Sequence, residues 1–206
     1  MKIRHSLSAL AIALLASGLH AEEAASAVST PKLAYGMLLQ HEGRVIFSPC
    51  RDRSYSIMED VSPDHAITQA LNSIGLASGK KLYVELMAVV EGGALKASAL
   101  NLAQVEGRCQ LPGTSDEAWR AAGNEPGWVL AAGGERIVLK RHGQPDLTAP
   151  YLAAKQDGKA VVFAADHLAV RLENVICRES TGDAVFGWTA SVTANDQALQ
   201  GCAWQR

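Results

Sequence analysis

The stretch that decides the fold is residues 81–105, KLYVELMAVVEGGALKASALNLAQV. Its first part alternates, so that Leu82, Val84 and Leu86 share one face, as in a half-buried β-strand. A Gly-Gly pair then provides a turn, and a second apolar strand follows it. The stretch therefore predicts an antiparallel hairpin and indicates a β-rich fold.

Shorter strands precede this hairpin, and one helix separates them from it. Residues 33–39 and 44–48 are apolar runs on either side of a His-Glu-Gly turn, and residues 54–58 continue in strand style. A Ser-Pro-Asp signal at residues 62–64 then begins a helical spacing of apolar residues. Short strands with one helix between them predict a small closed barrel of the oligonucleotide/oligosaccharide-binding (OB) type over residues 32–111.

A second β domain is predicted over residues 117–206, after a Pro- and Gly-containing linker at residues 112–116. Turn-punctuated strands are expected at residues 128–132, 136–141, 159–164, 168–176, 185–194 and 198–204. The predicted fold class is therefore all-β with one short helix, in two small antiparallel β-barrel-like domains, of which the first is OB-like.

The first residues predict export from the cytoplasm. Lys2 and Arg4 precede an apolar run that is too short to span a bilayer, and a small residue suits cleavage after Ala21. Residues 1–21 are therefore expected to be a signal peptide, followed by a disordered leader at residues 22–31. The expected location is the periplasm.

The charge of the chain limits its partners. The formal net charge is −2, and it becomes more negative when Lys2 and Arg4 leave with the signal. A mildly acidic chain without a basic run is poorly suited to nucleic acid. No membrane span is expected after the signal, so the expected partners are a soluble periplasmic protein, a small molecule or a cell-wall fragment.

The four cysteines predict disulfides. Cys50, Cys109, Cys177 and Cys202 all follow the signal, and an even count in an exported chain favours bridges. Three pairings are possible, of which Cys50–Cys109 with Cys177–Cys202 is the one that closes each half of the chain separately. The close C-x2-C spacing of a zinc site is missing.

Nothing in the sequence predicts a catalytic residue, a cofactor or a metal. The histidines beyond the signal lack ligand spacing; they are His41, His65, His142 and His167. No G-x-S-x-G motif occurs, and oxidised cysteines are not nucleophiles. The chain is therefore not expected to be an enzyme.

The most distinctive motif is GNEPGW at residues 123–128. In one interpretation its glycines and proline shape a turn, and Trp128 fills the core of the second domain. In the other, Asn124 and Glu125 lie at a rim, and Trp128 is the floor of a groove. The other three tryptophans allow the same two interpretations.

Together with CRES at residues 177–180 and LQGCA at residues 199–203, this motif resembles a family of bacterial envelope proteins. Members share GNEP-x-W, a C-x-D-x-M-S-G-like segment and a terminal L-x-G-C. The resemblance covers residues 117–204 and implies an envelope location. Arg178 and Glu179 of the second segment join Asn124, Glu125 and Trp128 as candidate ligand or partner contacts.

The first half of the chain resembles, more loosely, the small barrel domain of NlpE-type envelope lipoproteins. The resemblance lies in residues 35–36, 47–50 and 82–86. That family is associated with copper resistance and envelope stress, but its paired-cysteine motif is missing here. The resemblance therefore implies a barrel and an envelope location without copper binding.

Three functions follow from these features. The leading one is a non-enzymatic periplasmic binding or interaction protein in envelope maintenance or stress response. The alternative is an inhibitor or immunity protein directed against a secreted hydrolase, which inserts a protruding loop at residues 142–158. The third is an enzyme or metal handler, which requires a pocket where Glu125 meets Arg178 and Glu179.

Overall fold

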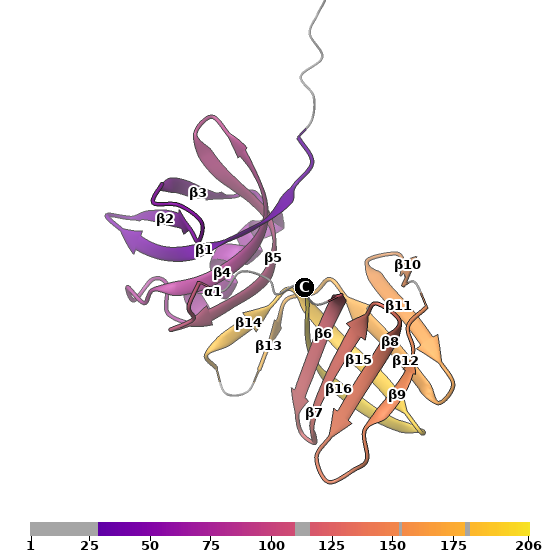
Figure 1. The fold of residues 1–206 in the computed structure, drawn as a ribbon. Coiled ribbons are helices and arrows are strands. Elements are labelled where there is room, and N and C mark those ends of the chain that lie inside the picture. Colours follow the sequence, from indigo (N-terminus) through magenta and orange to yellow (C-terminus); the bar gives the residue numbers. More distant parts are fainter. Residues whose placement is uncertain (1–28, 110–115, 153, 180–181) are drawn as a thin grey trace, which may run out of the picture.

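The computed structural model describes residues 29–109, 116–152, 154–179 and 182–206, which form two β-lobes (Figure 1). The predicted signal peptide, the leader up to residue 28 and the linker up to residue 115 lie outside the described residues. Within these ranges, no helix has the length and apolarity that a membrane crossing requires.

Five strands of the first lobe close into a barrel. They are β1 (Lys32–His41), β2 (Arg44–Pro49), β3 (Ser56–Asp60), β4 (Leu82–Glu91) and β5 (Ala94–Val105). The ring runs β1-β2-β3-β5-β4 and returns to β1. Every pairing is antiparallel except β3 with β5. The predicted hairpin of residues 81–105 is confirmed as β4 and β5.

The interior of the barrel is apolar, and a single helix packs against it. Leu82, Val84 and Leu86 are fully buried and share the barrel core, as predicted. The half-buried strand expected from the alternation is not found here, because Tyr83 and Glu85 on the other face are buried as well. The helix α1 (Ala66–Ser73) buries Ile67 and Leu71 in the same core. It lies between β3 and β4 in the sequence, as predicted.

The start of this helix differs in detail from the prediction. A 3-10 turn, η1 (Pro63–His65), precedes α1. Asp64 and His65 have positive φ angles, so the helix begins only at Ala66 and not at Pro63. Asp60 stabilises the first turn of α1, since its carboxylate accepts the backbone N–H of Thr68 at 2.7 Å. The Ser62 hydroxyl accepts the N–H of Ile67 at 3.2 Å.

The second lobe is a curled nine-stranded sheet with an apolar interior. In spatial order its strands are β10 (Lys155–Asp157), β11 (Ala160–Ala165), β12 (Leu168–Glu173), β15 (Trp188–Ala194), β16 (Gln197–Gln205), β6 (Glu117–Asn124), β7 (Gly127–Gly133), β8 (Arg136–Arg141) and β9 (Leu147–Pro150). All neighbours are antiparallel. The predicted all-β class, with one short helix and two barrel-like units, is confirmed.

One hairpin of the second half belongs to the sheet of the first lobe. β14 (Ala184–Phe186) pairs with β5, and β13 (Cys177–Arg178) pairs with β14. Figure 1 shows this hairpin beside the barrel, between the two lobes. The chain enters the second sheet again after Gly187. The same chain therefore contributes strands to both sheets in turn, so the sheets are linked by the backbone as well as by side-chain contact.

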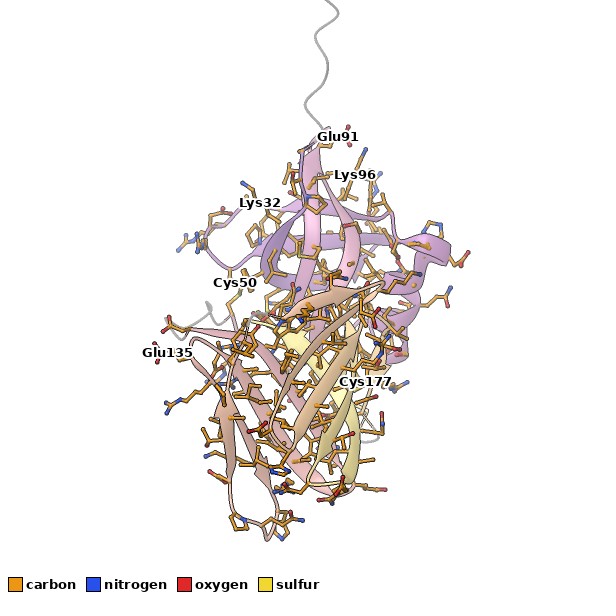
Figure 2. The ribbon with its side chains drawn as sticks, turned by 90° about the vertical axis from the view of Figure 1, so that its right-hand side faces the viewer. Lys32, Cys50, Glu91, Lys96, Glu135 and Cys177 are labelled. Carbon is orange, nitrogen blue, oxygen red and sulfur yellow. A yellow bond between two sulfur atoms is a disulfide. The ribbon has the colours of Figure 1, made fainter. Side chains whose placement is uncertain are left out.

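The predicted disulfide pairing is confirmed, but one bridge has another role than expected. Cys50–Cys109 closes within the first half of the chain. Cys177–Cys202 joins β13, in the sheet of the first lobe, to β16 of the second lobe. It therefore connects the lobes and does not close the second one, because the β13–β14 hairpin lies in the other sheet. Figure 2 shows Cys50 and Cys177 near the boundary between the lobes.

Candidate functional site

The GNEPGW motif forms the turn between β6 and β7, at the end of the second lobe that lies away from the barrel (Figure 1). Asn124 and Glu125 are exposed there, whereas Trp128 is only 3% exposed and its Nε1 donates to the Gln200 carbonyl at 3.2 Å. A Cβ on Gly123 would overlap this indole, so the glycine allows the close approach. Trp128 thus packs in the core, and two of the three residues are accessible.

The structure does not bring the other predicted site residues to this turn. Arg178 ends β13 and is exposed, and Glu179 follows it half-buried, on the hairpin of the first sheet. No hydrogen bond or ion pair joins either of them to Asn124 or Glu125 among the described residues. The residues that the enzyme hypothesis places in one pocket thus lie on different elements, the β6–β7 turn and β13 with the residue after it. The described ranges also hold no group of three His, Cys, Asp or Glu placed to bind a metal.

The remaining tryptophans also serve packing. Trp119 and Trp188 make an edge-to-face pair with ring centroids 4.9 Å apart, and Trp119 is buried. Trp204 packs against Phe186 of the β13–β14 hairpin at 5.2 Å. These contacts favour the core interpretation over a stacking platform.

An exposed apolar surface lies elsewhere, on the outside of the barrel. Leu39, Ile46 and Ile57 occupy neighbouring register positions on β1, β2 and β3. Ile57 is 37% exposed, and Tyr55, two residues before it, is 70% exposed. Leu39 and Ile46 are half-buried. We refer to Leu39, Ile46, Tyr55 and Ile57 as the barrel face. Exposed large apolar side chains in a group are more informative than single ones, since they indicate interaction surfaces.

Arginines border the barrel face. Arg44 is exposed at the start of β2, and Arg51 and Arg53 are exposed on the loop that leads to β3. This loop begins at Cys50, which is held by its disulfide and by a 3.0 Å bond from its N–H to the Tyr35 carbonyl. The barrel face thus combines apolar area with guanidinium groups.

The same loop is fixed from within by a side-chain turn. Asp52 accepts the backbone N–H of Ser54 at 2.8 Å and also its hydroxyl. These hydrogen bonds from Ser54 lower the pKa of the Asp52 carboxyl below its ordinary value. Asp52 is therefore ionised at neutral pH and shapes the loop between the two arginines.

The barrel face is open to solvent and chemically suited to an anionic, partly apolar partner. β2 and β3 lie on the side of the barrel away from the second lobe (Figure 1). Arginine pairs with carboxylates through a planar fork of donors, and a tyrosine ring offers an apolar surface with a polar tip. In the sequence, the signal for this surface is the alternation of Tyr55 and Ile57 with the polar Ser54 and Ser56.

A second exposed feature is the loop between β8 and β9, residues 142–146, which protrudes at the free end of the second lobe (Figure 1). It is shorter than the predicted loop at residues 142–158, because β9 and β10 lie within that range. Its base is held by a 2.9 Å bond from the His142 N–H to the Gly127 carbonyl. Gln197 Oε1 accepts from both Arg141 and Gln144 at 3.4 Å.

A broad groove of the second lobe is lined by both acidic and basic side chains. It has a volume of about 990 Å³ on the outer face of β6–β9, with a floor that includes Val129. Arg120 pairs with Glu117 on one side of it, and Lys140 lies 3.7 Å from Asp146 on the other. These two ion pairs leave four of the charged side chains in this groove already neutralised.

Comparisons with protein-family models, with curated proteins and with solved structures find no match for this chain.

Proposed function

We propose that this chain is an exported, non-enzymatic binding protein that recognises a soluble periplasmic protein or a cell-wall fragment through its barrel face. Its role would lie in envelope maintenance or stress response. The charged, signal-like start of the sequence supports export, and two disulfides are compatible with an oxidising compartment.

The OB-like assignment of the first lobe is part of this proposal. The strand order β1-β2-β3-β5-β4, with the helix between β3 and β4, supports it. Barrels of this type bind ligands on the face of their second and third strands, between neighbouring loops. The places of Ile46 on β2 and Ile57 on β3 support the barrel face as the binding surface.

The observation that carries the proposal is the exposure of Tyr55 and Ile57 beside Arg51 and Arg53. A folded chain gains about 25 cal/mol for each Å² of apolar surface that it buries, so the exposed Ile57 of β3 and Tyr55 just before this strand leave area available for a partner. The arginines favour a partner that carries carboxylates. Peptides and cell-wall fragments both meet this description.

Site-specific photo-cross-linking tests the proposal. The mature chain, residues 22–206, carries a photoreactive amino acid in place of Tyr55 and is exposed to periplasmic extract and to solubilised cell-wall fragments. The control carries it in place of Val129, which is similarly open at 49% exposure but lies on the second lobe. We expect a discrete adduct from the first variant only. Equal labelling of both variants, or adducts from Val129 alone, contradicts the proposal.

The protruding loop favours one alternative function, an inhibitor or immunity protein directed against a secreted hydrolase. A loop that extends from a rigid sheet and is held at its base suits insertion into an enzyme cleft. The same cross-linker in place of Gln144 separates the two functions. An adduct from this position with a hydrolase, together with loss of its activity, supports the inhibitor and contradicts binding through the barrel face.

A further inference from the structure

A buried amide is one of the contacts between the lobes. Asn101 of β5 is 1% exposed, and it pairs with the backbone of Gln205 at the end of β16. Its Oδ1 accepts the Gln205 N–H at 2.8 Å, and its Nδ2 donates to the Gln205 carbonyl at 3.0 Å. The Asn101 side chain thus makes the two backbone hydrogen bonds with Gln205 that a neighbouring strand would otherwise make. It joins the barrel wall to the second lobe.

A buried carboxylate supports the same amide from the barrel side. Glu85 of β4 is 6% exposed, and its Oε2 accepts a second hydrogen bond from Asn101 Nδ2 at 2.7 Å. Its Oε1 accepts the Tyr83 hydroxyl at 2.9 Å. A buried carboxylate is costly when it is charged and lacks a cationic partner, and no ion pair to Glu85 is present among the described residues.

The charged and titratable groups around Glu85 are few. Tyr35 of β1 lies opposite it in register, and Tyr83 lies on its own strand. Arg206, which follows β16, is the cation whose charge acts on Glu85, but its Nε lies 4.0 Å from the Glu117 carboxylate. Arg51 acts on Tyr35. No group in this set neutralises Glu85 by direct contact.

We propose that Glu85 is a proton-operated latch between the lobes. The neutral carboxyl keeps the end of β16 closed against the barrel through Asn101. Ionisation favours an opened junction, because the open form hydrates the carboxylate. Cys177–Cys202 keeps the lobes tethered in both forms.

The direction of the effect follows from linkage. Burial raises the pKa of Glu85 above its ordinary value, and this outweighs the hydrogen bonds from Tyr83 and Asn101 and the Arg206 charge, which lower it. The closed form therefore binds the proton more tightly than the open form. The stability that this proton gives the closed form over the open form is fully present below the pKa of Glu85 in the open form. It is lost as pH rises through the pKa of Glu85 in the closed form, and the closed-to-open ratio falls by about tenfold for each pH unit between the two values.

Amide hydrogen exchange of Gln205 tests the latch, because its N–H bonds to the other lobe. The neighbouring Arg206 N–H bonds to Ala118 within the second lobe at 3.0 Å and serves as the internal control. Between about pH 4 and about pH 7, we expect the protection factor of Gln205 to fall by about tenfold or more, while that of Arg206 holds. In Glu85→Gln, which keeps the shape without the charge, Gln205 should be equally protected at both pH values.

Two results would overturn the latch. One is a Gln205 protection factor that does not change with pH in the natural chain. The other is a change of equal size in Glu85→Gln. If that variant does not fold, a carboxyl titration of Glu85 by NMR in the natural chain decides the question. The latch requires that Glu85 titrate above the ordinary range of a glutamate and that Gln205 protection follow the same midpoint.

Discussion

Gly187 is the residue at which the chain passes from one sheet to the other. Its N–H donates to the Asn101 carbonyl at 2.8 Å, and its carbonyl accepts from Asn174 at 3.3 Å. A Cβ at this position would lie 1.8 Å from the Leu100 carbonyl oxygen. The backbone at Gly187 lies so close to the backbone of β5 that no side chain fits between them, and this position therefore requires glycine.

Gly187→Ala should therefore destabilise the protein by about 3 kcal/mol or more, because backbone atoms must move to admit the methyl group. The measurement is urea unfolding with both disulfides intact. Gly127→Ala is the control, since its Cβ would come no closer than 4.0 Å to the nearest atoms, and it should change stability by less than about 0.5 kcal/mol. Equal losses in the two variants would show that Gly187 is not a tight crossing point.

At the scale of elements, the sequence predicts the long alternating strands and misses the atypical ones. β4 and β5 follow from period two, and the helix follows from its apolar spacing. β6 (Glu117–Asn124) was not predicted, because its Ala- and Gly-rich sequence has low strand propensity and is extended only by pairing with β7 and β16. Of these two partners, β16 lies about 80 residues further along the sequence, so this pairing leaves no local pattern.

The same limit applies to the candidate sites. The GNEPGW sequence allows two interpretations, a structural turn or the rim of a groove, and its local pattern does not separate them. The β13–β14 hairpin could not be assigned to the first sheet, since β13 has two residues and its partner β5 lies far back in the sequence. The inter-lobe role of Cys177–Cys202 was hidden for the same reason.

This hairpin depends on its disulfide. Replacing both Cys177 and Cys202 by Ala should lower stability by about 3.5 kcal/mol on the chain-entropy estimate for a 25-residue separation. It should also expose the short β13 strand, so that trypsin cleaves after Arg178 faster. Limited proteolysis with mass spectrometry measures this cut. Replacing Cys50 and Cys109 by Ala should leave the rate of that cut unchanged, and an equal increase would place the weak point elsewhere.

At the scale of the whole molecule, the junction decides whether the lobes unfold together. All four tryptophans lie in residues 117–206, so their fluorescence follows the second lobe, while far-UV circular dichroism follows both. If Asn101 couples the lobes, the two unfolding curves coincide in the natural chain, which is a standard test of two-state behaviour.

Asn101→Ala should separate these curves. The change leaves the Gln205 N–H without its acceptor and Glu85 without one of its donors, and each buried unpaired group costs about 1–3 kcal/mol. That cost falls on the contact between the lobes, so the barrel and the curled sheet should lose their common transition. Ser98→Ala is the matched control, because the Ser98 hydroxyl bonds to the Met87 carbonyl within the barrel. It should weaken the first lobe and leave the coupling intact. Coincident curves in Asn101→Ala would mean that the apolar contacts of Phe186 and Trp204, with the disulfide, hold the lobes together without the buried amide.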